Sequence, residues 1–258
     1  MKKLTILLLL TFSIKALFAD CALSGMEFLP KEREISLNSM FIIQGYSLSQ
    51  ITIASFENRK IFLESSEGEL IELNLQEILK GKMELTQASF LPSKELKPNT
   101  SYTLKYANQT ESETQEMQEW NSEINDFEVV RWKTTNKKSV KSLNPNLRIT
   151  FEKADVIQYG CGPSANAIFN IANKGESEIW YRTEFVDLST KEKTVYFITE
   201  WKDKLYVGHG MCAGAFTFNE TGKYKVRFTP MNTDGEMLET TKWTTFESPF
   251  ATDKNPFK

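Results

Sequence analysis

Short runs of alternating apolar and polar residues, or of β-branched and aromatic residues, recur along most of the chain and predict β-strands. In the first part of the chain these runs cover residues 41–44, 50–56, 60–64, 69–75, 84–90, 101–106 and 127–134. In the second part they cover residues 148–151, 165–171, 178–186, 194–199, 213–218, 223–229 and 238–246. Only residues 75–80 have a helical pattern, with room for a turn or two. The pattern therefore predicts an all-β chain of antiparallel sheets in a sandwich or barrel.

A polar and basic break at residues 136–145, which ends in a proline, separates the two groups of strands. This composition is typical of a linker. The chain has 258 residues, enough for two domains of about 100–130 residues each. We predict one β-sandwich over residues 20–138 and a second over residues 139–258, with the boundary near Val140.

The N-terminus has the order of a secretory signal peptide. A lysine pair precedes an apolar run at residues 4–14, and small residues follow at Ala16 and Ala19. The run is shorter than the roughly 20 residues that span a membrane. Cleavage after Ala19 would remove residues 1–19 and leave a periplasmic, cell-surface or secreted chain without a transmembrane segment. Lipoprotein anchoring through Cys21 is the less favoured alternative, because Asp20 stands where lipoprotein signals carry a small residue.

Three short motifs carry a family resemblance. Residues 96–104 read Leu-Lys-Pro-Asn-Thr-Ser-Tyr-Thr-Leu, which resembles the L-x-P-x-T-x-Y corner of fibronectin type III and bacterial immunoglobulin-like domains. Residues 131–135 resemble the last strand of such modules, and residues 222–226 form a similar G-x-Y-x-V strand. The resemblance implies two tandem β-sandwiches in which a tyrosine, Tyr102 in the first, holds the turn against the following strand. A fold of this kind does not specify a function.

The three cysteines leave the disulfide pairing open. Cys161 and Cys212 lie in glycine-rich turns of the same predicted domain, so we expect these two to pair. Closing that loop would stabilise the fold by about 4 kcal/mol in the chain-entropy model. Cys21 would then be free, intermolecular or modified. In a competing interpretation Cys212 is a nucleophile with His209 as its base, but three residues of spacing in a glycine-rich loop do not fix that geometry.

Other features argue against catalysis, cofactors and nucleic acid. The chain has one histidine and no G-x-S-x-G motif, which disfavours serine hydrolases and zinc sites. Residues 232–236 carry oxygen ligands but lack the spacing of a calcium loop, and we interpret them as a hairpin turn. The net charge of −3 disfavours a general nucleic-acid binder. We predict no catalytic residue, metal or cofactor.

Exposed aromatic and acidic residues are the remaining candidates for binding. Trp180 and Tyr181 are adjacent in a strand and point to opposite faces, so one of them could be exposed, and Trp201 lies near a polar turn. With the loop residue His209, Trp180 and Trp201 are candidate ligand contacts. Residues 111–128 contain seven acids and no base. In this predicted acidic loop, the candidates for contacting a partner are Glu111, Glu113, Glu116 and Glu119.

These observations favour a non-catalytic interaction or structural module at the cell envelope or surface, whose partner is another envelope or extracellular protein. Two alternatives stay open. One is a carbohydrate-binding module that uses exposed aromatic residues, and the other is an unrecognised extracellular hydrolase that uses paired carboxylates.

Overall fold

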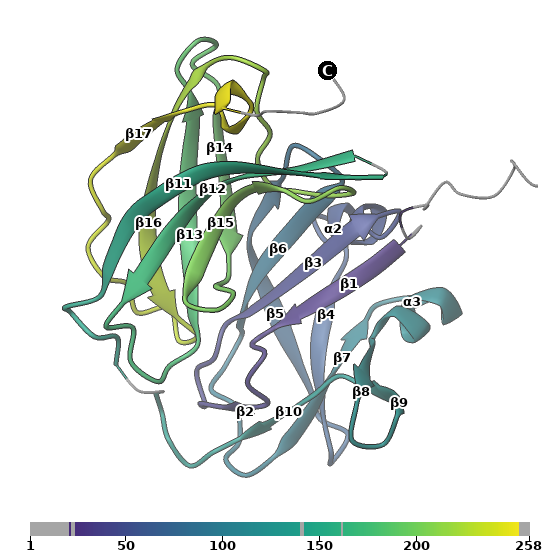
Figure 1. Cartoon of the computed structure of the whole chain (residues 1–258). Helices are drawn as coiled ribbons and strands as arrows, with labels where there is room; N and C mark the ends of the chain where they lie inside the picture. The colour runs from purple at the N-terminus through teal and green to yellow at the C-terminus, as the bar shows by residue number, and fades with distance from the viewer. Residues whose placement is uncertain (1–20, 22–23, 140–141, 161, 253–258) are drawn as a thin grey trace, which may run out of the picture.

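A computed structural model describes residue 21 and residues 24–139, 142–160 and 162–252. It consists mostly of antiparallel strands with a few short helices, as the sequence pattern predicts (Figure 1). The predicted signal peptide at residues 1–19, its cleavage point and the predicted boundary at Val140 lie outside the described residues. We call residues 24–139 the N-terminal half and residues 142–252 the C-terminal half. No helix in the part of the chain that the structure describes is long and apolar enough to cross a membrane.

One continuous eight-stranded sheet forms the N-terminal half. Its strands follow the order β1 (Ser24–Leu29), β3 (Phe41–Ser47), β6 (Leu85–Pro92), β5 (Leu70–Lys80), β4 (Ile61–Ser65), β7 (Ser101–Tyr106), β10 (Arg131–Thr134) and β2 (Glu34–Ile35). All eight strands contribute to one hydrophobic core, in which Trp132 packs edge-on against Phe41 with ring centroids 5.0 Å apart. The sheet therefore bends around a single core, whereas the predicted sandwich implies two separate sheets.

Two sheets pack face to face in the C-terminal half. One has the order β11 (Arg148–Tyr159), β12 (Gly162–Ala172), β15 (Lys204–His209), and the other has the order β14 (Lys193–Ile198), β13 (Ile179–Asp187), β16 (Lys223–Asn232), β17 (Thr244–Glu247). A short 3₁₀ helix at Pro249–Thr252 follows. Aromatic rings fill the core between the sheets; Phe169 of β12 meets Phe228 of β16 at 4.9 Å.

Several predictions of local structure were wrong. Residues 75–80 are not helical but continue β5, where a bulge between Leu75 and Glu77 shifts the register. The bulge turns Leu75 and Ile78 toward the N-terminal core and Leu79 toward the C-terminal half. Apolar residues at this spacing resemble the pattern of a helix.

The prediction also misassigned segments elsewhere. Residues 50–56 form α2 (Gln50–Ser55), whose Ile53 and Phe56 are both buried one helical turn apart. Residues 213–218 are not a strand, and β1 and β15 were not predicted. The predicted acidic loop begins with α3 (Glu111–Glu116).

The tyrosine corner that the family resemblance implies at Tyr102 is present, and the C-terminal half has the same arrangement at Tyr224, which was not predicted. The backbone N–H of Lys97 donates to the Tyr102 hydroxyl at 2.9 Å, and the N–H of Asn219 donates to the Tyr224 hydroxyl at 2.8 Å. In each case the donor lies five residues before the tyrosine. Both tyrosine side chains are buried, so no water replaces the bond if the hydroxyl is removed.

Tyr102→Phe and Tyr224→Phe should each lower the free energy of unfolding by about 1 kcal/mol, because each leaves one backbone N–H without its acceptor. Urea denaturation followed by intrinsic fluorescence measures this difference. Tyr159→Phe is the control, since the Tyr159 side chain is half exposed. A loss no larger than that of the control would show that these corners do not stabilise the fold.

The two halves are joined by an extensive interface. Leu29 and Ile42 pack against Trp180, Phe197 and Met231 of the C-terminal half. Loops of the two halves also meet directly in an isolated antiparallel bridge: the N–H of Met83 donates to Gly214 O at 3.0 Å, and the N–H of Gly214 donates to Met83 O at 2.8 Å.

Gln87 is buried, and its side-chain amide hydrogen-bonds to backbone groups on the unpaired edge of β14 across this interface. Its Oε1 accepts from the N–H of Phe197 at 2.7 Å, and its Nε2 donates to Phe197 O at 3.2 Å. The predicted linker is held as well, because Lys137 O accepts from the N–H of Leu37 at 3.1 Å. These contacts fix the relative position of the two halves.

Candidate functional site

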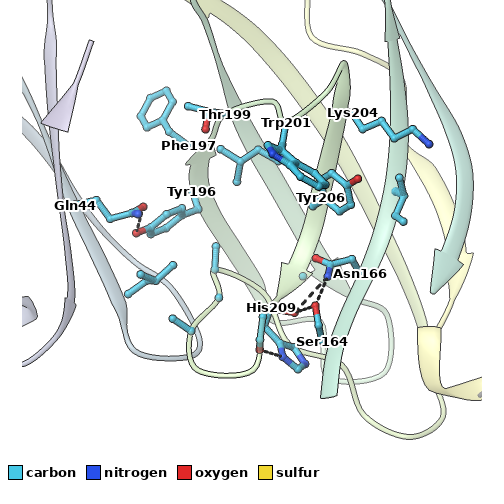
Figure 2. Close-up of a pocket in the computed structure, with 18 of the residues that line it drawn as sticks. Gln44, Ser164, Asn166, Tyr196, Phe197, Thr199, Trp201, Lys204, Tyr206 and His209 are labelled. Carbon is cyan, nitrogen blue, oxygen red and sulfur yellow. Dashed lines mark hydrogen bonds between the residues drawn. The ribbon is translucent and has the colours of Figure 1, made fainter. Parts of the chain in front are cut away.

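A cleft of about 730 Å³ lies between the halves. One wall is the outer face of the β11–β12–β15 sheet, whose first hairpin reaches over the N-terminal half (Figure 1). The chain between β14 and β15 forms a second wall. Gln44 from the N-terminal half and Tyr196 and Phe197 from β14 lie together in the cleft (Figure 2). Gln87 also contributes to its lining.

Strand register determines which side chains face this cleft. Asp155, Asn166 and Gly208 are cross-strand neighbours, and so are Lys153, Ile168 and Tyr206. Because side chains alternate between the faces of a sheet, these positions face the cleft, and the residues between them, such as Leu205, enter the C-terminal core.

Trp201 and Tyr206 form an aromatic platform at the cleft. Their ring centroids are 5.7 Å apart, the ring planes are tilted by 58°, and Trp201 is 59% exposed (Figure 2). Lys202 Nζ lies 4.4 Å from the centroid of the Trp201 ring. Trp201 and Lys204 pair through two backbone hydrogen bonds of 2.9 and 3.2 Å around a tight turn. Lys202 and Asp203, the two central residues of the turn, have φ values of 52° and 57°. This left-handed pair is the geometry of a type I′ turn, and it fixes the direction in which Trp201 leaves the backbone.

Hydrogen-bonding groups line the cleft below the platform. Asn166 Nδ2 donates to Ser164 Oγ at 3.1 Å and to His209 O at 3.3 Å. The Tyr196 hydroxyl donates to Gln44 Oε1 at 2.9 Å. Burial raises the pKa of Tyr196 above its usual range, so this hydroxyl remains a neutral donor.

The charged groups of the cleft are paired. Lys204 Nζ lies 2.6 Å from Glu152 Oε2, and Lys153 Nζ lies 2.7 Å from Asp155 Oδ2. The hydrogen bond from Lys204 holds the pKa of Glu152 below its usual value. A general acid of a glycosidase needs a raised pKa, so Glu152 is poorly suited to that role.

His209 lines the cleft but does not form a catalytic pair there. Its Nδ1 lies 2.8 Å from Gly210 O. The hydroxyl of Ser164, a neighbouring serine, donates to the backbone carbonyl of His209 at 3.1 Å and not to its ring. The ring is mostly buried, so the structure places His209 as a wall residue.

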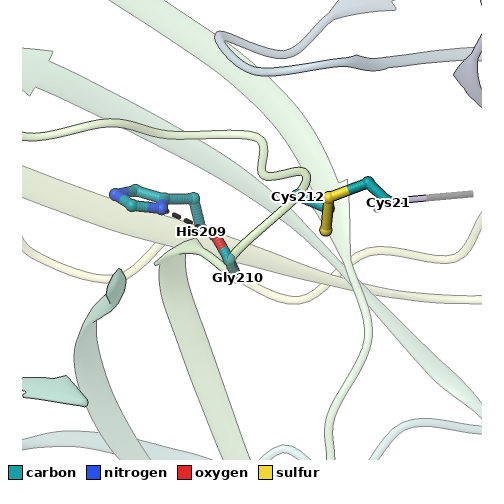
Figure 3. The surroundings of a disulfide bond; sticks show 4 residues. All are labelled: Cys21, His209, Gly210 and Cys212. Atoms are coloured by element: carbon teal, nitrogen blue, oxygen red, sulfur yellow. Dashed lines mark hydrogen bonds between the residues drawn. A yellow bond between two sulfur atoms is a disulfide. The ribbon is translucent and has the colours of Figure 1, made fainter. Parts of the chain in front are cut away.

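The structure corrects the predicted disulfide. Cys212 is bonded to Cys21, with Cα atoms 5.7 Å apart, and not to Cys161 (Figure 3). The pairing was mispredicted because the Cys212 loop packs against the N-terminal half through Met83 and Gly214, which the sequence does not reveal. Cys161 lies outside the described residues. A disulfide-bonded Cys212 has no thiolate, so the nucleophile hypothesis for this residue is also wrong.

Trp180 is fully buried and does not contribute to the cleft. Its Nε1 donates to Glu178 Oε1 at 2.7 Å, and the same carboxylate accepts from the backbone N–H groups of Lys31 and Glu32 at 3.0 and 2.8 Å. The neighbouring Tyr181 is buried too. Both side chains lie in the interior because both faces of β13 are covered, so Trp180 is wrong as a candidate ligand contact.

The predicted acidic loop is an ordered element, in which some acidic side chains contact the rest of the protein and others are exposed. Glu113 pairs with Arg59, Glu119 with Arg33, and Glu116 Oε1 accepts from Ser49 Oγ at 2.7 Å. These three of the four candidates therefore tie the segment to the body. Glu111 lies exposed in the first turn of α3.

After α3 the chain forms a two-stranded hairpin, β8 (Gln118–Asn121) and β9 (Asp126–Val129). Trp120 and Phe127 are cross-strand partners, with ring centroids 5.3 Å apart. Trp120, Phe127 and Val129 share one face and are 54%, 58% and 43% exposed, and Ile124 in the turn is 59% exposed. We call these four residues the hairpin face.

Tyr206 and Asn166 were not recognised as site residues from the sequence. Tyr206 lies on β15, which was not predicted as a strand. Lys204–His209 alternates in the way a strand does, so this strand could have been recognised. Asn166 lies in a predicted strand, but nothing local marks it as facing a cleft. Within the described residues, no group of three or more histidine, cysteine, aspartate and glutamate side chains is placed to hold a metal ion.

Comparisons with known proteins do not identify a family. No protein-family model matches the chain, and no curated protein matches its sequence. Similar solved structures include a pullulanase from Anoxybacillus sp. LM18-11 complexed with maltotriose (9% identity, TM-score 0.25, 82% of this chain and 24% of the pullulanase). A cytokine receptor complex is also similar, with 9% identity and a TM-score of 0.27 over 88% of this chain and 98% of that chain. So is a DUF4785 family protein from Legionella pneumophila, with 10% identity and a TM-score of 0.22 over 90% of this chain and 58% of that chain. The chain spans about a quarter of the length of the pullulanase, and TM-scores this low carry no argument about fold or function.

Proposed function

We propose that this chain is an exported, non-catalytic interaction module, built of two units of the immunoglobulin or fibronectin type III kind, that binds another extracytoplasmic protein through the hairpin face. The observation that carries the proposal is the exposure of four large apolar side chains on one projecting hairpin. Contiguous exposed apolar surface of this kind marks interaction sites in soluble proteins.

The hairpin face is held in a fixed position. Met117, just before β8, is buried, and its carbonyl accepts from the N–H of Val130, just after β9, at 3.0 Å. Arg33 pairs with Glu119 on the opposite side of β8. A two-stranded hairpin is marginally stable alone, and these contacts preorganise it for binding.

Charge indicates the kind of partner. Glu123, in the turn, is exposed beside the hairpin face, whereas Asp126 and Glu128 are exposed on the opposite face of the hairpin, where Glu128 is the cross-strand partner of Glu119. An apolar patch on an acidic hairpin is complementary to an apolar groove with lysine or arginine near it. The disulfide is compatible with export, since such bonds persist in oxidising compartments. Glu152 is paired with Lys204 and Cys212 is in a disulfide, so neither residue is suited to the catalytic role considered for it.

A photo-crosslinking residue in place of Phe127, introduced in intact producing cells, should yield one dominant protein adduct that mass spectrometry can identify. With that protein in hand, Trp120→Ala should weaken the affinity at least 30-fold, the effect of removing a central tryptophan from an interface. Trp201→Ala is the matched control, since Trp201 is similarly exposed on another surface. The absence of a specific adduct, or equal losses in both variants, would contradict the proposal.

A further inference from the structure

We propose that the cleft between the halves binds an uncharged, short oligosaccharide, with the aromatic platform of Trp201 and Tyr206 stacking against a sugar ring. This is a second binding site, separate from the hairpin face. It goes beyond the proposed function, and its test does not depend on the protein partner.

The platform provides the first reason. A tryptophan in a concave site normally buries most of its surface, but Trp201 remains 59% exposed beside Tyr206. Two non-glycine residues in the left-handed region hold it there, a conformation that costs free energy and persists where the surroundings impose it. An aromatic ring offers a broad apolar surface at little cost in conformational entropy, and the C–H-bearing face of a sugar ring is a flat apolar surface that matches it.

The polar groups provide the second reason. Amides and hydroxyls of Gln44, Ser164, Asn166 and Thr199 line the same cleft as the platform. Sugar hydroxyls both donate and accept hydrogen bonds, and a mixed lining of this kind can satisfy them. The volume of about 730 Å³ is within the range of sites for small molecules.

The charges provide the third reason, because the charged side chains that line the cleft have partners already. Lys204 pairs with Glu152 and Lys153 with Asp155. Glu27 accepts from Gln44 Nε2 at 2.8 Å and pairs with Lys31 at 3.1 Å. A neutral ligand leaves these pairs intact, so the lining favours a neutral ligand over an ionic one. An extended peptide that binds by strand addition needs a free sheet edge, but the principal wall of the cleft is a sheet face.

The test uses the mature full-length protein on an array of neutral oligosaccharides of glucose, mannose, galactose and N-acetylglucosamine. Sialylated and sulfated counterparts are included. Binding to at least one neutral series is expected, with weaker binding to its charged counterparts. Titration with the best neutral oligosaccharide should perturb tryptophan fluorescence. Trp201→Ala should weaken this binding at least tenfold, whereas the matched variant Trp120→Ala should bind normally.

Fold integrity is checked by thermal unfolding, since Trp201 is exposed and its removal should leave the melting temperature almost unchanged. The oligosaccharide should be recovered intact by chromatography after incubation with the protein. Cleavage of the oligosaccharide would show that the cleft hydrolyses the sugar and does not merely bind it. Absence of neutral binding at millimolar concentration, a preference for charged glycans, or binding that survives Trp201→Ala would each overturn the inference. These outcomes leave the hairpin proposal unaffected, since that depends on Trp120 and Phe127.

Discussion

Replacing Cys21 or Cys212 with serine should lower the free energy of unfolding by up to about 5 kcal/mol, the largest effect expected of any single substitution here. The bond joins residues 191 positions apart. In the chain-entropy model, closing so long a loop removes more freedom from the unfolded chain than a short loop does. Urea denaturation of the oxidised protein measures the loss.

Cys161→Ser is the matched control for this experiment. If Cys212 pairs with Cys21, the control keeps the bond and unfolds like the parent protein, and non-reducing peptide mapping recovers the Cys21–Cys212 linkage. Recovery of a Cys161–Cys212 peptide, or a large loss of stability in the control, would show that the structural pairing is wrong. Loss of the Cys21–Cys212 bond should also change the shape of the cleft, because Gly210 and residues 213–215 of the Cys212 loop contribute to its lining.

Arg59→Ala should destabilise the N-terminal half by about 3–5 kcal/mol, because it leaves the carboxylate of Glu113 largely buried without its partner. Arg59 Nη2 lies 2.8 Å from Glu113 Oε2, and Arg59 Nε donates to Ala107 O at 2.6 Å. The guanidinium also lies 5.3 Å from the ring centroid of Tyr106. Glu113 in turn completes the capping box of α3 with Thr110, so the loss should extend to the segment that carries the hairpin face.

The same pair predicts how stability depends on pH. The hydrogen bonds from Arg59 lower the pKa of Glu113 to about 2, from an ordinary value of 4.5. Because the folded pKa is depressed, the unfolded chain binds the proton first. The contribution of this group is therefore complete above about pH 4.5 and is lost as the pH falls toward 2.

The free energy of unfolding, measured between pH 5 and pH 2.5, should fall less steeply in Glu113→Gln than in the parent protein. Glu111→Gln is the matched control, since Glu111 is exposed on the same helix. Identical pH profiles for Glu113→Gln and the parent protein would rule out the ion pair as a source of acid sensitivity.

Local features of the fold could be read from the sequence because they depend on neighbours in the chain. Alternation at residues 101–106 and 223–229 predicts β7 and most of β16, since a period of two places every second side chain in the core. The tyrosine corner at Tyr102, which the sequence motif predicts, joins residues only five positions apart. β5 packs against the cores of both halves, and its bulge interrupts the alternation of side chains between the two faces. The local prediction for residues 75–80 is therefore wrong.

Exposure of the candidate site residues depended on the docking of the two halves. Trp180 and Trp201 look alike in the sequence, yet one is buried at the interface and the other is exposed at the cleft. The seven acids of residues 111–128 are alike in composition, but only tertiary contacts distinguish Glu113, paired with Arg59, from the exposed Glu128. The aromatic pairing of Trp120 with Phe127 likewise appears only once the hairpin register is known.

By itself, the sequence determined the β-rich class, most strand positions and the tyrosine corner at Tyr102, because side-chain periodicity and short-range hydrogen bonds are local properties. The tertiary structure alone decided the pairing of Cys212, the burial of Trp180 and the existence of a cleft lined by Trp201, Tyr206 and Asn166. These features arise where residues more than 100 positions apart meet, as Gln87 meets Phe197. The free energy of such contacts depends on surfaces that exist only after both halves have folded and packed together.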